Sequence, residues 1–200
     1  MRHGAVEVDP ARLRGNPPLS ELGRGQARAL AERLRDTHFD RCLVSPLVRA
    51  QETARLLTSG RAIPLETHAC LAEGSYGALD GMERGSELER YPEHFRLGRT
   101  VIPRLAATGE TAPGGEPRSA FLARAQAAHT LVTAALADPT ARVLVVSHGG
   151  LLAYLIQLLL GHEPRDQVTI GFDFCGVARV LSYREEPAFG PFAMLHFVAN

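Results

Sequence analysis

Five residues could carry out phosphoryl transfer if the fold brings them together: Arg2, His3, Arg49, Glu73 and His148. Arginine side chains bind phosphate oxygens through paired hydrogen bonds and stay charged at any working pH. One histidine ring can attack phosphorus and form a covalent phosphohistidine, while a second can donate a hydrogen bond to a phosphate oxygen. A carboxylic acid can protonate the leaving oxygen and then take a proton from the incoming water. We expect no metal ion and no other cofactor, because the guanidinium groups offset the phosphate charge.

The elements predicted around these residues give them a common location. Apolar runs at residues 42–44 and 142–146 are typical of buried parallel strands, and a helical pattern follows each of them. Arg49 lies one turn into the first of these helices, and His148 stands at the end of the second run. In open α/β sheets, ligands bind beyond the carboxyl ends of the strands. We therefore expect both side chains at one site, with Glu73 in a glycine-flanked loop close by.

The alternation of strands and helices predicts an α/β fold: a three-layer sandwich with a mostly parallel central sheet flanked by helices. Helical patterns cover residues 19–36, 46–57, 118–137 and 151–160, and further extended segments cover 61–68, 176–183 and 192–198. In the first helix we expect Ser20 as the N-cap and Leu22, Ala27, Leu30 and Leu34 on the apolar face. A chain of 200 residues suits a single domain, 1–200, with a small helical insertion at about 82–113.

The composition excludes several classes of protein. All 22 basic residues are arginine, so the lysine that a P-loop NTPase, a Schiff-base enzyme or a pyridoxal-phosphate enzyme needs is absent. The 22 basic residues balance 22 acidic ones, so no general positive field would attract nucleic acid or an anionic membrane. The partner we expect is instead a small phosphorylated metabolite.

The cysteines and the apolar runs indicate the compartment. Cys42, Cys70 and Cys175 are odd in number and form no CxxC pattern, so we expect neither a disulfide framework nor a zinc site. The apolar run at 151–160 is too short to cross a bilayer, and we find no signal-peptide pattern. We therefore expect a cytoplasmic protein.

Six short segments in one order resemble a known family. Arg2-His3-Gly4 is followed by PLSELGRGQA, SPLVRAQETA, LAEGSYGALDG, PGGE and VVSHGG. This series is similar to that of the histidine phosphatase superfamily, in its phosphoglycerate-mutase-like branch. The resemblance implies the phosphoglycerate mutase-like fold and a possible homodimer.

The resemblance also implies a role for each site residue. His3 would be the phosphorylated nucleophile and Glu73 the general acid and base, with Arg2, Arg49 and His148 completing the catalytic set. The positions expected to contact the substrate are Arg2, Gly4, Arg49, Tyr76, His148 and Gly149.

Three features depart from the family pattern. Family members carry an apolar strand before Arg-His-Gly, where only Met1 stands here; we expect the reading frame to begin upstream, the alternative being a sheet without that strand. A hydroxyl residue and an asparagine usually contact the phosphoryl group, and Val6 and Asp9 replace them here, which should weaken the hold on a dianion. The insertion is shorter than in the mutases and lacks lysine, which favours a hydrolase.

We therefore predict a metal-independent phosphomonoester hydrolase that works through a phosphohistidine on His3. Two alternatives stay open: a phosphoglycerate-type phosphomutase, and a non-catalytic module that binds a phosphorylated ligand, as Val6 and Asp9 would allow. Because Glu73 must carry a proton in the first step and lies in a partly desolvated pocket, we expect an acid-side optimum. The identity of the ester is left open.

Overall fold

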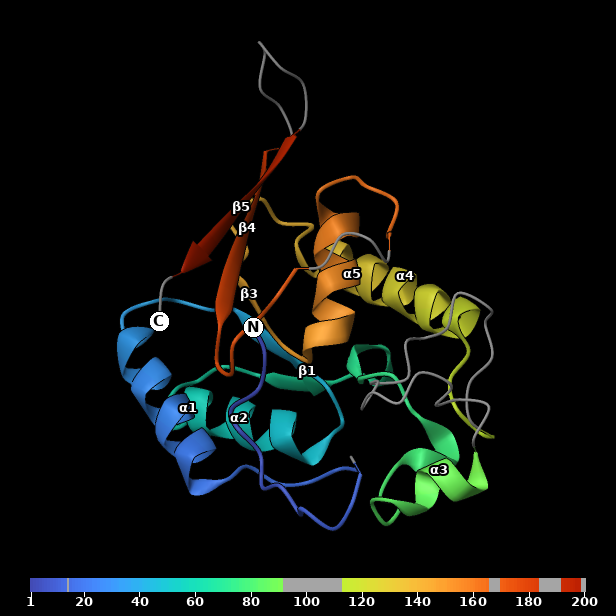
Figure 1. The fold of residues 1–200 in the computed structure, drawn as a ribbon. Coiled ribbons are helices and arrows are strands. Elements are labelled where there is room, and N and C mark those ends of the chain that lie inside the picture. Colours follow the sequence, from blue (N-terminus) through green and yellow to red (C-terminus); the bar gives the residue numbers. More distant parts are fainter. Residues whose placement is uncertain (14, 92–112, 166–169, 184–191, 199–200) are drawn as a thin grey trace.

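Three parallel strands form the centre of the fold in the computed structural model (Figure 1), which describes residues 1–13, 15–91, 113–165, 170–183 and 192–198. They are β1 (Arg41–Val44), β2 (Leu65–Thr67) and β3 (Val143–Val146), in the order β2-β1-β3. The register aligns Cys42 of β1 with Leu65 on one side and Leu144 on the other. The predicted parallel sheet is confirmed, and β1, whose residues 42–44 are buried, is its middle strand.

Helices cover both faces of this sheet (Figure 1). Helices α1 (Glu21–Arg33) and α2 (Val48–Thr58) lie on one side, and α4 (Arg118–Ala135) and α5 (Gly149–Leu159) lie on the other. The side chains of β1 alternate between the two cores: Cys42 and Val44 pack with α1 and α2, while Leu43 packs with α4 and α5. The predicted three-layer α/β arrangement is therefore what the chain adopts.

The remaining elements are short or lie at the end of the chain. Two 3-10 helices, η1 (Ala69–Leu71) and η2 (Gly77–Leu79), flank the loop that carries Glu73, and α3 (Ser86–Arg90) follows. Strands β4 (Val177–Tyr183) and β5 (Phe192–Val198) pair as an antiparallel ribbon that extends away from the helices (Figure 1). Of the predicted insertion at 82–113, α3 lies within the described residues, and 92–112 lie outside them.

Helix α1 confirms its predicted cap and corrects one predicted core residue. The Ser20 side chain accepts a hydrogen bond from the Gly23 N–H at 3.1 Å. Leu22, predicted on the apolar face, is instead 68% exposed. Gly23 takes the buried position in the first turn, where a Cβ atom would stand only 1.9 Å from the Ala5 carbonyl oxygen. Helix α1 therefore contacts Ala5 through the backbone of Gly23, and the Leu22 side chain faces solvent.

The chain start runs beside the end of β3. The Met1 ammonium donates to the Val145 carbonyl at 2.7 Å, and the Ser147 N–H donates to the Met1 carbonyl at 3.0 Å. Arg2 forms an isolated parallel bridge with Ser147. Residues 1–3 thus lie beside β3 at the central sheet. This is where the apolar strand that family members carry before Arg-His-Gly was expected to end.

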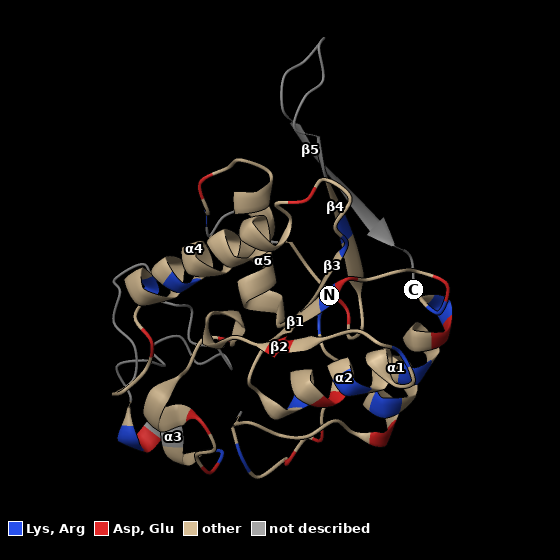
Figure 2. Ribbon diagram, turned by 180° about the vertical axis from the view of Figure 1, so that it is seen from behind, with Lys and Arg blue, Asp and Glu red and all other residues tan. Residues whose placement is uncertain are grey.

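Charges of both signs lie on the outer surfaces of α1 and α2 (Figure 2), as in the ion pair of Arg28 with Glu21 at 3.2 Å. Exposed pairs of this kind contribute little to stability. Within the described ranges, no helix is both long enough and apolar enough to cross a membrane.

Candidate active site

His3 is held with one ring nitrogen engaged by the backbone. Its Nδ1 lies 2.7 Å from the Gly4 carbonyl oxygen, and the residue is only 5% exposed. Because a carbonyl oxygen can only accept a hydrogen bond, Nδ1 carries the proton and Nε2 presents a lone pair. Arg49 Nε donates to this Nε2 at 3.2 Å. The imidazole is thus fixed in the tautomer that a nucleophile attacking through Nε2 requires.

Gly4 fixes the backbone beside this histidine. A Cβ atom at Gly4 would lie 2.6 Å from the carbonyl oxygen of Gly23, so the segment can approach α1 only with glycine here. The Gly4 N–H donates to Thr53 Oγ1 at 3.1 Å, and Thr53 Oγ1 donates to the Arg49 carbonyl at 2.7 Å. The Gly4 backbone groups, predicted to contact substrate, are therefore engaged by Thr53 and His3.

His148 lies next to His3 although 145 positions separate them, since their ring centroids are 5.0 Å apart. It is the N-cap of α5, directly after β3, and is 1% exposed. Its Nε2 lies 2.7 Å from Ser45 Oγ, at the end of β1. Its Nδ1 is buried and has no hydrogen-bond partner among the described residues. The carboxyl ends of β1 and β3 thus meet at this histidine, as the sequence predicted.

Two guanidinium groups lie near the histidines. Arg49, buried in the first turn of α2, also donates from Nη1 to the Gly15 carbonyl at 3.4 Å. Arg2 donates from Nη1 to the Phe172 carbonyl at 2.6 Å, and its guanidinium carbon lies 4.1 Å from the centre of the Phe174 ring. Both arginines are near enough to act electrostatically on His3 and on His148. This concentrates positive charge where an anion would bind.

Glu73 reaches the same region from the loop between η1 and η2. Its Oε2 accepts the N–H of Gly150 in the first turn of α5 at 3.1 Å, and its Oε1 accepts the N–H of Gly74 at 3.1 Å. The first N–H groups of α2 and α5 could bind an anion, as those at helix N-termini often do. Two of them are taken by the protein, since Gly150 donates to Glu73 and Val48 donates to Asn16 Oδ1 at 2.9 Å.

Burial controls the protonation of the two histidines. Desolvation lowers the pKa of His3 to about 4, against the opposing effect of the Gly4 hydrogen bond, and the nearby Arg49 and Arg2 lower it further. Desolvation also lowers the pKa of His148 to about 2, with Arg49, His3, Arg124 and Arg2 contributing. Both imidazoles are therefore neutral at pH 7 in the unliganded protein, so His3 keeps its lone pair.

A turn near the end of the chain contributes a residue that sequence reasoning missed. Residues 173–176 form a turn closed by a hydrogen bond from the Gly176 N–H to the Asp173 carbonyl at 2.9 Å. It places the Phe174 ring 5.7 Å from the His3 ring, in addition to its contact with Arg2. The one available signal was an aromatic and glycine cluster, FDFCG, just before an extended segment, and this pattern alone predicts only a turn.

Arg124 was also missed by sequence reasoning, and its side chain supports the loop that carries Glu73. Arg124 forms two hydrogen bonds to Glu116, from Nε at 2.7 Å and from Nη2 at 2.5 Å. Its Nη1 donates to the Ala72 carbonyl at 2.5 Å, one residue before Glu73. Glu116 belongs to the PGGE segment singled out from the sequence, and it stands eight positions before Arg124.

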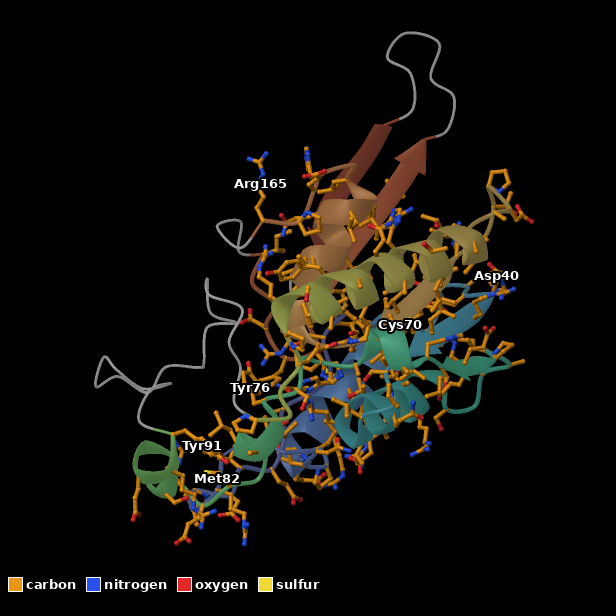
Figure 3. The ribbon with its side chains drawn as sticks, turned by 90° about the vertical axis from the view of Figure 1, so that its right-hand side faces the viewer. Asp40, Cys70, Tyr76, Met82, Tyr91 and Arg165 are labelled. Carbon is orange, nitrogen blue, oxygen red and sulfur yellow. The ribbon has the colours of Figure 1, made fainter. Side chains whose placement is uncertain are left out.

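The structure places Tyr76, Gly149 and Asp9 in three different environments. Tyr76 is the N-cap of η2 and lies on the side of the molecule that carries Met82 and Tyr91 (Figure 3); its substrate contact stays a prediction. Gly149 faces Arg2, since a Cβ atom there would stand 3.9 Å from Arg2 Cδ. Asp9 is exposed, accepts the Ala11 N–H at 2.8 Å, and lies 3.7 Å from Arg12. Its carboxylate, expected to weaken phosphate binding, is thus paired locally.

In the described part of the chain, no three His, Cys, Asp or Glu side chains form a group that could hold a metal ion. The residues that could bind an anion are the histidines and arginines described above.

Comparison with known proteins identifies the family. Residues 1–190 match the model of the histidine phosphatase superfamily (branch 1). The chain belongs to this superfamily. Curated relatives of this histidine phosphatase include the adenosylcobalamin/alpha-ribazole phosphatase of Salmonella typhimurium, 32% identical over 163 residues, covering 80% of this chain and 77% of the relative. Another, from Yersinia pestis, is named "Probable phosphoglycerate mutase GpmB" and is 28% identical over 191 residues, covering 94% and 85%.

A solved structure agrees with this assignment. The alpha-ribazole phosphatase from Shigella flexneri superposes with a TM-score of 0.82 at 25% identity, covering 99% of this chain and 93% of that one. The predicted fold and the predicted family are therefore confirmed, and the chain is a phosphatase of the histidine phosphatase superfamily.

Proposed function

We propose that this histidine phosphatase hydrolyses phosphate monoesters without a metal ion, through a covalent phosphohistidine on His3. The observation that carries the proposal is the hydrogen bond between His3 Nδ1 and the Gly4 carbonyl, which directs the Nε2 lone pair toward Arg49. Arg49 Nε occupies that lone pair in the structure. A bound phosphate oxygen would take over this N–H, because a hydrogen bond from a guanidinium to an anion is stronger than one to a neutral imidazole, and would leave Nε2 free to attack.

The first half-reaction transfers the phosphoryl group to the protein. His3 Nε2 forms a bond to phosphorus while the bond from phosphorus to the ester oxygen breaks. Glu73, in its protonated form, gives its proton to that oxygen, so the alcohol leaves neutral. Arg2, Arg49 and His148 hold the phosphate oxygens and offset the charge that develops on them.

The second half-reaction restores the enzyme. Water attacks phosphorus and gives a proton to the Glu73 carboxylate, while the bond from phosphorus to nitrogen breaks and its electron pair returns to His3. Inorganic phosphate leaves, and Glu73 is again protonated. Since the pKa of free His3 is lowered to about 4, the nucleophile stays unprotonated at the mildly acidic pH where we expect the optimum.

A phosphomutase is the second candidate, because the Yersinia relative carries that name. In a mutase the phosphoryl group on His3 would pass to a second hydroxyl of the same metabolite instead of to water. Incubation of 3-phosphoglycerate with a bisphosphoglycerate primer separates the two reactions, since a mutase forms the 2-isomer and a hydrolase releases phosphate.

The substrate we propose is a small phosphorylated metabolite. A panel of sugar, nucleotide and glycerate phosphates should include α-ribazole phosphate, for which the Salmonella and Shigella proteins are named. The three free cysteines fit a protein of the reducing cytoplasm. We also propose a homodimer, which sedimentation velocity would test.

The deciding experiment is phosphoenzyme trapping. The protein is mixed with ³²P-labelled ester, and the reaction is stopped rapidly without acid. The wild type should then carry acid-labile label, and His3→Ala should carry none and release no phosphate. His38→Ala, which changes an exposed histidine paired with Asp40, should label as the wild type does. EDTA should leave turnover unchanged. Reversible binding of esters without any labelled protein would identify a binding module and end the proposal.

A further inference from the structure

Ser45 is a buried hydroxyl residue whose two hydrogen bonds determine one proton position in the site. It follows β1, is 0% exposed, and its Oγ has two partners among the described residues. The Leu47 N–H donates to Oγ at 3.2 Å, and His148 Nε2 lies 2.7 Å from it. The Ser45 backbone is fixed on both sides, since its N–H donates to the Val146 carbonyl at 3.0 Å and its carbonyl accepts Gln51 Nε2 at 2.7 Å.

The direction of the first hydrogen bond is settled by chemistry. A backbone N–H can only donate, so Leu47 uses one lone pair of the Ser45 oxygen. The hydroxyl proton then needs an acceptor, and His148 Nε2 is the acceptor that the described residues offer it. Ser45 can donate to Nε2 only if Nε2 carries no proton. A neutral imidazole has one proton, so that proton must then lie on Nδ1.

The opposite tautomer leaves more hydrogen-bonding groups without a partner and is therefore less favourable. If Nε2 carried the proton, Ser45 Oγ would accept from both Leu47 and His148, and its own proton would have no acceptor among these groups. His148 Nδ1 would also present a bare lone pair, in a position with no donor among the described residues. A buried polar group without a partner is costly. When the proton lies on Nδ1 instead, the Nδ1–H donor is the single one of these groups that lacks a partner among the described residues.

We infer that Ser45 is a positioning residue that fixes His148 in the tautomer with its proton on Nδ1. The Nδ1–H group is then available to donate to an oxygen of a phosphate bound against both imidazoles, whose ring centroids are 5.0 Å apart. The inference concerns the neutral ring, which applies because desolvation lowers the pKa of His148 to about 2. Its consequence for catalysis rests on the proposed function, while the tautomer itself does not.

Nuclear magnetic resonance tests the tautomer directly. Long-range ¹H–¹⁵N spectra of the ¹⁵N-labelled wild type at pH 7, with the His148 signals assigned by their loss in His148→Gln, distinguish a protonated ring nitrogen from a bare one. We expect a protonated Nδ1 and a bare Nε2 in the wild type, and a shift toward the mixed state in Ser45→Ala. A wild-type ring protonated on Nε2 would overturn the inference, whether or not the enzyme turns over any ester.

A double-mutant cycle tests whether Ser45 acts through His148, with inorganic phosphate as the probe. Ser45→Ala should weaken phosphate binding by about 10- to 100-fold, the range expected for one hydrogen bond to a charged group. In the His148→Ala background the same change should cost less than about two-fold. An equal loss in both backgrounds would show a general structural effect and contradict the role. Thr58→Val is the matched control: it removes a buried α2 hydroxyl bonded to the Ala54 carbonyl at 2.9 Å, and should leave phosphate affinity unchanged.

Discussion

The carboxylate of Glu73 lies directly against the backbone of Gly150. Its Oε2 accepts the Gly150 N–H at 3.1 Å, and a Cβ atom at Gly150 would stand 2.6 Å from Oε1. No side chain larger than hydrogen fits at position 150 without moving the carboxylate. Since Gly150 stands two positions after His148, this contact holds the proposed acid and base next to the histidine proposed to bind phosphate.

The first prediction is that Gly150→Ala displaces Glu73 and impairs proton transfer. General acid–base catalysis contributes about 10²- to 10⁴-fold to rate, so we expect kcat to fall by at least roughly 10²-fold. Inorganic phosphate should still bind, because the arginines and histidines stay in place. Steady-state kinetics and phosphate inhibition measured on the same preparation check both parts.

Gly25→Ala is the matched control for this change. Gly25 lies in α1, and a Cβ atom at this position would have nothing within 4 Å of it. Alanine there should keep full activity and stabilise the helix by about 0.5–1 kcal/mol. Unaltered kcat in Gly150→Ala would mean that Glu73 does not act from the position the structure gives it.

The second prediction concerns Arg124, which joins Glu116 to the loop that carries Glu73. Arg124→Met removes the donor to the Ala72 carbonyl and leaves the Glu116 carboxylate, 17% exposed, without its guanidinium. We expect a loss of about 2–4 kcal/mol in the free energy of unfolding, together with a lower kcat. Urea denaturation and steady-state kinetics measure the two effects.

A second substitution separates the charge effect from the loop effect. The double variant Arg124→Met/Glu116→Gln should recover part of the stability, because no unpaired carboxylate remains, but not the kcat, because the Ala72 carbonyl still lacks its donor. Full recovery of both quantities would show that Arg124 does not position the Glu73 loop.

Much of this arrangement could be predicted from local sequence. Apolar runs located β1 and β3, and the residues that follow them, Arg49 and His148, meet because parallel strands end at one edge of the sheet. Leu22 could not be placed correctly, because the close approach of Gly23 to Ala5 depends on a tertiary contact that helical periodicity does not encode. The contact between Arg2 and Phe174 was equally invisible, since 171 intervening residues leave no periodic signal.

The third prediction is that acid destabilises the fold through the buried histidines. The pKa of His3 is lowered from 6.5 to about 4 and that of His148 from 6.5 to about 2, both chiefly by desolvation. Below pH 6.5 the unfolded chain therefore binds protons that the folded protein does not. The stability that the two neutral histidines contribute is complete above about pH 6.5, and it is lost as pH falls toward 4. Urea denaturation at pH 5 and pH 7 should show the loss. His148→Gln should reduce it and the exposed His38→Gln should not; an identical pH dependence in all three proteins would refute the assignment.

The fourth prediction is that the Phe174 ring orients Arg2. Cys175, with φ of 57°, adopts the left-handed conformation that is unfavourable for a residue with a Cβ atom. Three hydrogen bonds hold the turn in place: Cys175 N–H to the His3 carbonyl at 3.1 Å, Arg2 N–H to the Gly176 carbonyl at 3.1 Å, and Arg2 Nη1 to the Phe172 carbonyl at 2.6 Å. The strained turn thus places the Phe174 ring over the guanidinium, with its centre 4.1 Å from Cζ.

Replacing the ring by an aliphatic side chain should therefore weaken phosphate binding while leaving the turn apolar. A partly exposed cation–π contact contributes about 1 kcal/mol, so Phe174→Leu should raise the inhibition constant of inorganic phosphate roughly five-fold, and Phe174→Tyr, which keeps the ring, should restore it. Phe39→Leu removes a comparable ring from Arg61, 5.6 Å from its centre and outside the site, and should leave the constant unchanged. If leucine and phenylalanine at position 174 give the same phosphate affinity, the ring is only a filler of the turn, and Arg2 is oriented by its backbone acceptor alone.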